Sequence, residues 1–282
     1  MARRHIHSEP TSRLAIWARR IAGFALLASL LAIIIVRSGL LEIWPALATF
    51  AGALAIAVVA LLVAFAAFVV IWMEGLAGMG AALTAMAVSL ALLAYPAYLG
   101  LKASRLPWIY DITTDPIDPP RYDALSRLRP RDANPVTYSG LYAAEQQRKA
   151  YPDVGPLATN ATPQAAYDAA LAVVNKRRWR VVDGRAPQAG RREGHIEAVA
   201  RTPIMGFRDD VSIRVRAETD GARIDARSSS RYGSFDFGAN ASRVRGLMNE
   251  IEDAIRAQRP ERPPAQPTAK KSTPGKKDQS KK

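Results

Sequence analysis

Three long apolar stretches near the start of the chain constrain its fold more than any other feature. They cover residues 21–36, 46–73 and 76–99. A helix needs about 20 mostly apolar residues to cross the hydrocarbon core of a bilayer. The second and third stretches have this length, and the first reaches it when its flanks, up to Leu41, are included. The sequence therefore predicts three transmembrane helices within residues 15–101.

The predicted spans are typical of an anchor. None carries Asp, Glu, Lys, Arg or His at its middle, where transporters and proton relays usually need one. A cleaved signal peptide followed by two helices is the alternative interpretation. Residues 37–39, Arg-Ser-Gly, form a poor cleavage site, so we favour three retained helices.

The residues flanking the spans predict their orientation. Four tryptophans lie at span ends, where amphipathic indoles favour the headgroup region: Trp17, Trp44, Trp72 and Trp108. Five arginines precede the first span, whereas the next loop has only Arg37 beside Glu42, and Lys102 and Arg105 follow the third span. By the positive-inside rule, residues 1–14 are predicted to be cytoplasmic and the domain after the third span extracytoplasmic.

The net charge of +14 is concentrated at the two ends of the chain. Residues 260–282 are rich in Lys and Pro, a composition that predicts a disordered tail. The middle of the chain is only mildly basic and lacks a basic stripe with stacking aromatic side chains, so no nucleic-acid partner is expected. The absence of cysteine excludes disulfides, thiol chemistry and Cys-based zinc sites.

The polar part of the chain predicts an α+β domain. Residues 102–160 form an extended, Pro-rich entry segment, and residues 161–259 form the core. A helix starts at Thr162-Pro163, and a second helix covers residues 240–258 with a regular apolar stripe. Four strands are predicted between them, at residues 179–182, 194–201, 208–216 and 222–229. Their period-two alternation favours an antiparallel sheet with both helices on one face and charged residues on the other, solvated face.

Four sequence motifs resemble those of the domain of unknown function 1499 family. They are IYDITTD at 109–115, YPDVGPL at 151–157, ARTPIMGFRDD at 200–210, and RSSSRYG at 227–233 with DFGAN at 236–240. The resemblance covers residues 109–258. It implies an envelope-associated bacterial domain, and hence a multi-pass protein of the bacterial inner membrane, but it carries no established activity.

Charged side chains near the predicted strand ends form the candidate binding or structural cluster. Its members are Asp209, Asp210, Arg214, Arg227, Arg231, Asp236, Asn240 and Arg243. One interpretation is an ion-pair network, with Asp209 or Asp210 holding Arg227 or Arg231 and Asp236 capping the last helix. The other is an anion-binding groove, in which arginine forks bind a phosphate or carboxylate.

No motif assigns a catalytic residue, a metal site or a cofactor. His195, the one histidine of the predicted domain, lacks a nucleophile-elbow motif around the serines at 228–230. Two functions remain open. The preferred one is a non-enzymatic, membrane-anchored envelope module that contacts membrane lipid and binds an anionic polymer or an envelope protein. The alternative is a hydrolase-like envelope enzyme that uses Asp209, Asp210 or Asp236.

Overall fold

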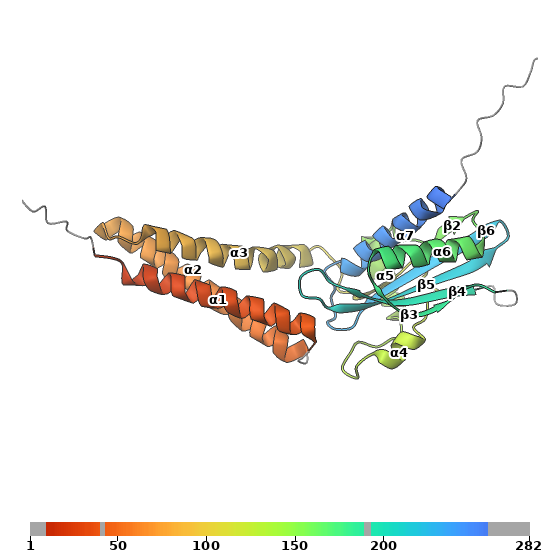
Figure 1. The fold of residues 1–282 in the computed structure, drawn as a ribbon, viewed down its shortest axis with the longest axis horizontal. Helices are drawn as coiled ribbons and strands as arrows, with labels where there is room; N and C mark the ends of the chain where they lie inside the picture. Colours follow the sequence, from red (N-terminus) through yellow and green to blue (C-terminus); the bar gives the residue numbers. More distant parts are fainter. Residues whose placement is uncertain (1–9, 40–42, 189–192, 259–282) are drawn as a thin grey trace, which may run out of the picture.

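The computed structural model describes residues 10–39, 43–188 and 193–258. Three long N-terminal helices are followed by an α+β domain with a six-stranded antiparallel sheet (Figure 1). The fold class expected from the sequence is confirmed, with two strands more than the four predicted. The predicted tail at 260–282 and most of the predicted cytoplasmic N-terminus lie outside the described residues.

The three N-terminal helices are long and apolar enough to cross a membrane. They are α1 (Arg13–Ser38), α2 (Ile43–Glu74) and α3 (Met79–Ala103). They pack through small side chains, which let helix backbones approach closely: Ala18, Ala22, Ala60, Ala64 and Ala85. α3 begins later than the predicted third span because Gly75 and Gly78 form a turn at positive φ.

Six strands form one sheet in the order β1-β6-β5-β4-β3, and β2 also pairs with β6. They are β1 (Asp111–Thr113), β2 (Leu157–Thr159), β3 (Arg180–Arg185), β4 (Glu193–Arg201), β5 (Arg208–Glu218) and β6 (Gly221–Ser230). β3 to β6 are the four predicted strands. β1 and β2 come from the Pro-rich segment that was expected to be only an extended entry. They add to the sheet because β6 would otherwise expose unpaired backbone groups at its edge.

Helices α6 (Pro163–Lys176) and α7 (Ala239–Gln258) cover one face of the sheet, as predicted (Figure 1). The Thr162 side chain caps α6 by accepting a hydrogen bond from the Ala165 amide. Inward-facing residues of the central strands, among them Ile196, Ile213 and Ile224, are fully buried against these helices. This apolar layer is the main core of the domain.

The opposite face of the sheet is charged and also buried. The expectation that it would be solvated is wrong, because residues 114–139 lie across it and include helix α4 (Ala124–Leu128). Polar groups of this covering segment bind the arginines beneath it. Arg214 donates to the Asp118 carbonyl oxygen at 2.7 Å, and Arg227 donates to that of Pro120 at 3.3 Å. Helix α5 (Gly140–Ala150) follows the covering segment.

Candidate functional site

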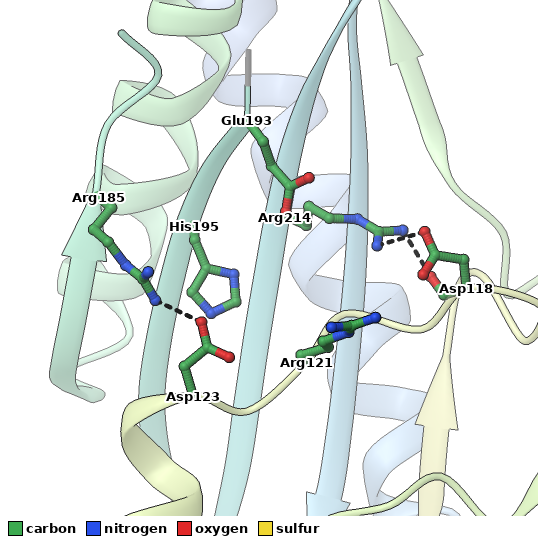
Figure 2. A pocket seen from close by; sticks show the side chains of 7 residues that line it. All are labelled: Asp118, Arg121, Asp123, Arg185, Glu193, His195 and Arg214. Carbon is green, nitrogen blue, oxygen red and sulfur yellow. Dashed lines mark hydrogen bonds and ion pairs between the residues drawn. The ribbon is translucent and has the colours of Figure 1, made fainter. Parts of the chain in front are cut away.

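A polar pocket lies between the charged face of the sheet and the covering segment (Figure 2). Its volume is about 450 Å³. The side chains that line it come from β3, β4 and β5 and from the covering segment: Asp118, Arg121, Asp123, Arg185, Glu193, His195 and Arg214. Their chemistry suits a charged or strongly polar ligand rather than an apolar one.

Two of the three arginines in the pocket are neutralised by acids of the covering segment. Arg185 binds Asp123 at 2.8 Å, and Arg214 binds Asp118 at 2.9 Å. Arg121 is exposed and makes no ion pair with any residue in the described part of the chain. The pocket therefore offers one guanidinium without an acid partner, and the Glu193 carboxylate, which lines the same pocket, also forms no ion pair among the described residues.

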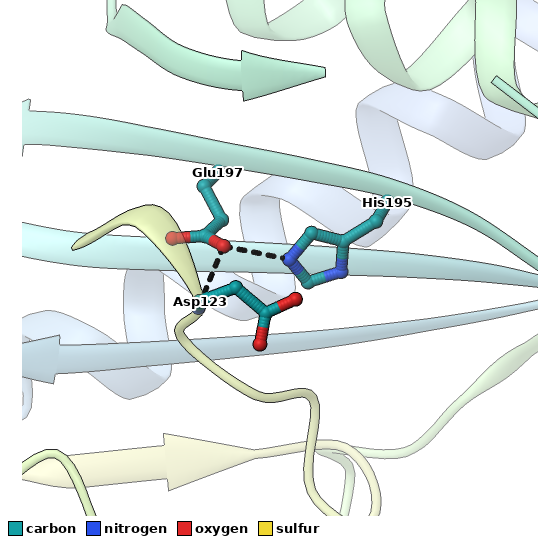
Figure 3. A group of neighbouring side chains, drawn as sticks. All are labelled: Asp123, His195 and Glu197. Carbon is teal, nitrogen blue, oxygen red and sulfur yellow. Dashed lines mark hydrogen bonds and ion pairs between the residues drawn. The ribbon is translucent and has the colours of Figure 1, made fainter. Parts of the chain in front are cut away.

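A second group of side chains adjoins the pocket, formed by Asp123, His195 and Glu197 (Figure 3). The buried Glu197 carboxylate accepts hydrogen bonds from the backbone amides of residues 123–125 at 2.7 to 3.0 Å. It also binds His195 Nε2 at 3.0 Å. Burial raises the pKa of Glu197, but the hydrogen bonds from His195 and these amides outweigh it and lower the pKa to about 2. Glu197 thus anchors the start of α4 to β4.

The Asp123, His195 and Glu197 side chains could in principle hold a metal ion, since their ligand atoms lie within 4.8 Å of one another. Their bonding argues against this use. The Glu197 oxygens already accept four hydrogen bonds, and Asp123 is paired with Arg185. A cation would have to displace donors that hold α4 in place, so we interpret this group as a structural cap.

The candidate cluster predicted from the sequence is divided by the sheet into two groups. Asp209, Asp236, Asn240 and Arg243 lie on the helix-facing side. Arg243 binds both Asp209 and Asn240, and Asp236 caps the start of α7 by accepting from the Gly238 and Asn240 amides at 2.8 and 2.9 Å. Burial raises the pKa of both Asp209 and Asp236.

The other four members lie on the face under the covering segment. Arg231 binds Asp210, as one interpretation predicted. Arg227 instead binds Asp111 of β1, through Nε at 3.0 Å and Nη2 at 2.6 Å. Arg214 binds Asp118 and the fully buried Asp225. The eight residues therefore lie on two faces of the sheet, in several separate ion pairs and hydrogen-bonded groups, and not in one groove.

The three acids named in the enzyme hypothesis do not all lie on one side of the sheet. Asp210 lies on the opposite side of the sheet from Asp209 and Asp236, so the three carboxylates do not converge. His195 is bonded to Glu197, whereas Ser228 and Ser230 face the helices. Raised pKa values alone favour acid–base chemistry at Asp209 and Asp236. Both side chains, however, are buried and hydrogen-bonded, and neither lines the pocket, so a structural role explains them better.

Sequence reasoning missed most of the residues around the pocket. His195 and Glu197 are two residues apart on β4, so the alternation of the strand places both side chains on one face. This spacing could have indicated from the sequence that they lie together. Asp118, Arg121 and Asp123 lie in irregular chain, where no periodicity indicates which way a side chain points. Their roles depend on how the covering segment crosses the sheet.

Comparison with known proteins identifies the domain but not its activity. A family model described as a protein of unknown function (DUF1499) matches residues 111–251, from β1 into α7. No curated protein matches the chain. The matched region contains every strand of the sheet, α6 and the first part of α7. The chain therefore belongs to the DUF1499 family.

Proposed function

We propose that this protein is a non-enzymatic, membrane-anchored module of the bacterial envelope. In this proposal α1 to α3 span the inner membrane, the N-terminus is cytoplasmic, and the DUF1499 domain lies outside the cytoplasm. The domain binds an anionic envelope component, either a polymer or an acidic surface of a partner protein. The anchor is supported by the length and composition of the three helices, and the orientation by the arginines that precede α1.

The observation that carries the binding proposal is that Arg121 lines the polar pocket without an acid partner among the described residues. The other two arginines of the pocket, Arg185 and Arg214, form ion pairs with Asp123 and Asp118 (Figure 2). Arg121 is therefore the arginine that is available to bind a ligand. A guanidinium binds carboxylate or phosphate oxygens through paired hydrogen bonds. The acids of the enzyme hypothesis are themselves bonded to arginines or backbone amides, which favours a binding role.

A binding measurement on the full chain in detergent tests the pocket. Polyglutamate and polyphosphate serve as carboxylate and phosphate probes, and the melting temperature is followed at low and high salt. We expect at least one probe to raise the melting temperature of the wild type at low salt, and Arg121→Gln to lose that gain. Arg127→Gln, which changes an exposed arginine outside the pocket, is the matched control. Equal gains in all three proteins would count against the pocket.

The orientation is tested with reporters that are active only outside the cytoplasm. A reporter fused after Gln258 should be active, and one fused within the first twenty residues should be inactive. The reverse pattern would place the domain in the cytoplasm and remove the envelope role.

A further inference from the structure

Three arginines form a cluster at the end of the sheet nearest the N-terminal helices. Arg201 ends β4 and pairs across the ladder with Arg208, which begins β5. Arg180 begins β3, and its charge acts on Arg208. All three side chains are exposed. We call Arg180, Arg201 and Arg208 the arginine cluster.

The arginine cluster lacks the acids that neutralise the other arginines of the charged face. Arg214, Arg216, Arg223 and Arg227 each bind at least one aspartate. Within residues 10–39, 43–188 and 193–258, no acid forms an ion pair with any member of the cluster. Burial and then repulsion from Arg201, Arg231 and Arg180 lower the pKa of Arg208. Like charges are thus held together without an acid partner from the part of the chain that the structure describes.

A contact with α1 fixes where the cluster lies. Arg37, in the last turn of α1, donates from Nη1 to the carbonyl oxygens of Pro203 at 2.7 Å and Ile204 at 3.0 Å. Both acceptors lie in the β4–β5 loop, between the cluster members Arg201 and Arg208. Gly206 in this loop has φ +71°, and a Cβ there would lie 2.9 Å from Arg37 Cγ. The loop is therefore closely fitted to the end of α1.

The same end of the helices has the features of a membrane–water boundary. α1 ends, α2 begins and α3 ends on the side that faces the sheet (Figure 1). Trp44 and Trp108 lie at this end and are exposed, as expected for side chains in the headgroup region. Ile204, at the tip of the β4–β5 loop, is also exposed. The cluster consequently lies at the level where a bilayer presents its phosphates.

We propose that the arginine cluster binds the phosphate of an anionic phospholipid headgroup. A guanidinium group binds phosphate oxygens through paired hydrogen bonds, and a bound phosphate would supply the negative charge that no acid among the described residues supplies there. The inference rests on the membrane placement of α1 to α3 in the proposed function. It does not rest on their orientation, because both leaflets contain phospholipid phosphates.

Lipid retention by the full chain tests this site. The protein in neutral detergent is titrated with dioctanoyl phosphatidylglycerol or dioctanoyl phosphatidylcholine, and bound lipid is counted by native mass spectrometry. We expect the wild type to retain phosphatidylglycerol preferentially. The variant Arg201→Gln/Arg208→Gln should retain it roughly tenfold more weakly, since each basic side chain near a surface contributes to anionic-lipid binding. The control Arg127→Gln/Arg148→Gln changes two exposed arginines elsewhere in the domain and should retain it normally.

Three outcomes would overturn the proposal. They are unchanged retention by the cluster variant, equal retention of the two lipids by the wild type, and displacement of phosphatidylglycerol by an equal concentration of inorganic phosphate. The last would indicate a site for free phosphate. If the double variant does not fold, the exposed and ion-pair-free Arg180→Gln tests the same cluster, with weaker retention expected again. Reporters that place the domain in the cytoplasm would overturn the proposed function and leave these lipid results interpretable.

Discussion

Arg231 holds Asp210 through two hydrogen bonds to one carboxylate oxygen, from Nε at 2.9 Å and from Nη2 at 2.7 Å. Arg129 of the covering segment binds the other oxygen at 2.6 Å. Asp210 has no exposed surface. One buried carboxylate thus joins β5, the end of β6 and the covering segment, which makes it a central element of the charged face.

Asp210→Asn should destabilise the domain strongly, because it leaves two largely buried guanidiniums without their counter-charge. Breaking a buried ion pair from one side typically costs about 3–5 kcal/mol. Thermal unfolding of the full chain in detergent, followed by circular dichroism, measures the loss.

Asp118→Asn is the matched control for this measurement. Asp118 also binds arginines, but its side chain is 54 % exposed, so the expected loss is about 1 kcal/mol or less. An unaltered melting temperature in Asp210→Asn would show that the pair does not stabilise the fold. It would then make Asp210 the first residue to examine for activity.

Glu197 gives the domain a specific acid sensitivity. Its pKa is lowered from 4.5 to about 2 in the folded protein. A depressed acid pKa contributes stability that is present above the unfolded value and is lost as the pH falls through the folded value. Glu197→Gln should therefore lower the free energy of unfolding by roughly 2–3 kcal/mol at pH 7. This difference in stability from the wild type should vanish as the pH falls from about 4.5 to 2.

Melting temperatures at several pH values between 2 and 7 measure this effect. Glu218→Gln, an exposed change near the end of β5, should follow the wild type at every pH. A penalty for Glu197→Gln that persists undiminished at pH 2 would mean that packing, and not charge, explains the loss.

The apolar half of this fold could be predicted from sequence, and the charged half could not. The Thr162 cap, the stripe of α7 and the alternation of β5 each follow from local spacing, and each is found in the structure. The short strands β1 and β2 have no such periodicity. They exist because β6 offers an unpaired edge, which is a property of the assembled sheet.

The candidate site shows the same division. The Asp210–Arg231 pair and the Asp236 cap could be anticipated, because strand register and helix starts are local features. The ion-pair interpretation expects Asp209 or Asp210 to hold Arg227 or Arg231. Arg231 does bind Asp210, but Arg227 binds Asp111, more than a hundred residues earlier in the chain. A residue's partner in a buried polar network depends on which distant segment covers it. Periodicity contains no information about that choice.

Tyr122 stabilises the charged face in two separable ways. Its hydroxyl donates to the Asp210 carbonyl oxygen at 3.1 Å, and its ring lies 4.5 Å from the Arg227 guanidinium carbon. Tyr122→Phe removes only the hydrogen bond and should cost about 1 kcal/mol. Tyr122→Leu also removes the cation–π contact and part of the packing, so its loss should be larger by roughly 1–2 kcal/mol. Equal losses, measured by thermal unfolding, would show that the ring contact with Arg227 contributes nothing.

Gly221 fixes the junction between the β5–β6 hairpin and β2. Its φ is +149°, a conformation that side chains disfavour, and an added Cβ would lie 2.0 Å from the Thr159 carbonyl oxygen and 2.7 Å from Asn160 Cα. Both neighbours are backbone atoms that cannot rotate away. Gly221→Ala should therefore lower the free energy of unfolding by roughly 2–5 kcal/mol, because it combines backbone strain with overpacking.

Gly155→Ala is the matched control for Gly221→Ala, since nothing lies within 4 Å of a Cβ built at Gly155 and its φ is not positive. That change should leave stability unchanged or raise it slightly, because alanine restricts the unfolded chain. Thermal unfolding of both variants in the same detergent provides the comparison. If Gly221→Ala has the same melting temperature as the wild type, β2 does not pack against the β5–β6 hairpin in solution. If it melts lower while Gly155→Ala does not, the Pro-rich segment that supplies β2 is an integral part of the sheet and not a linker from the membrane.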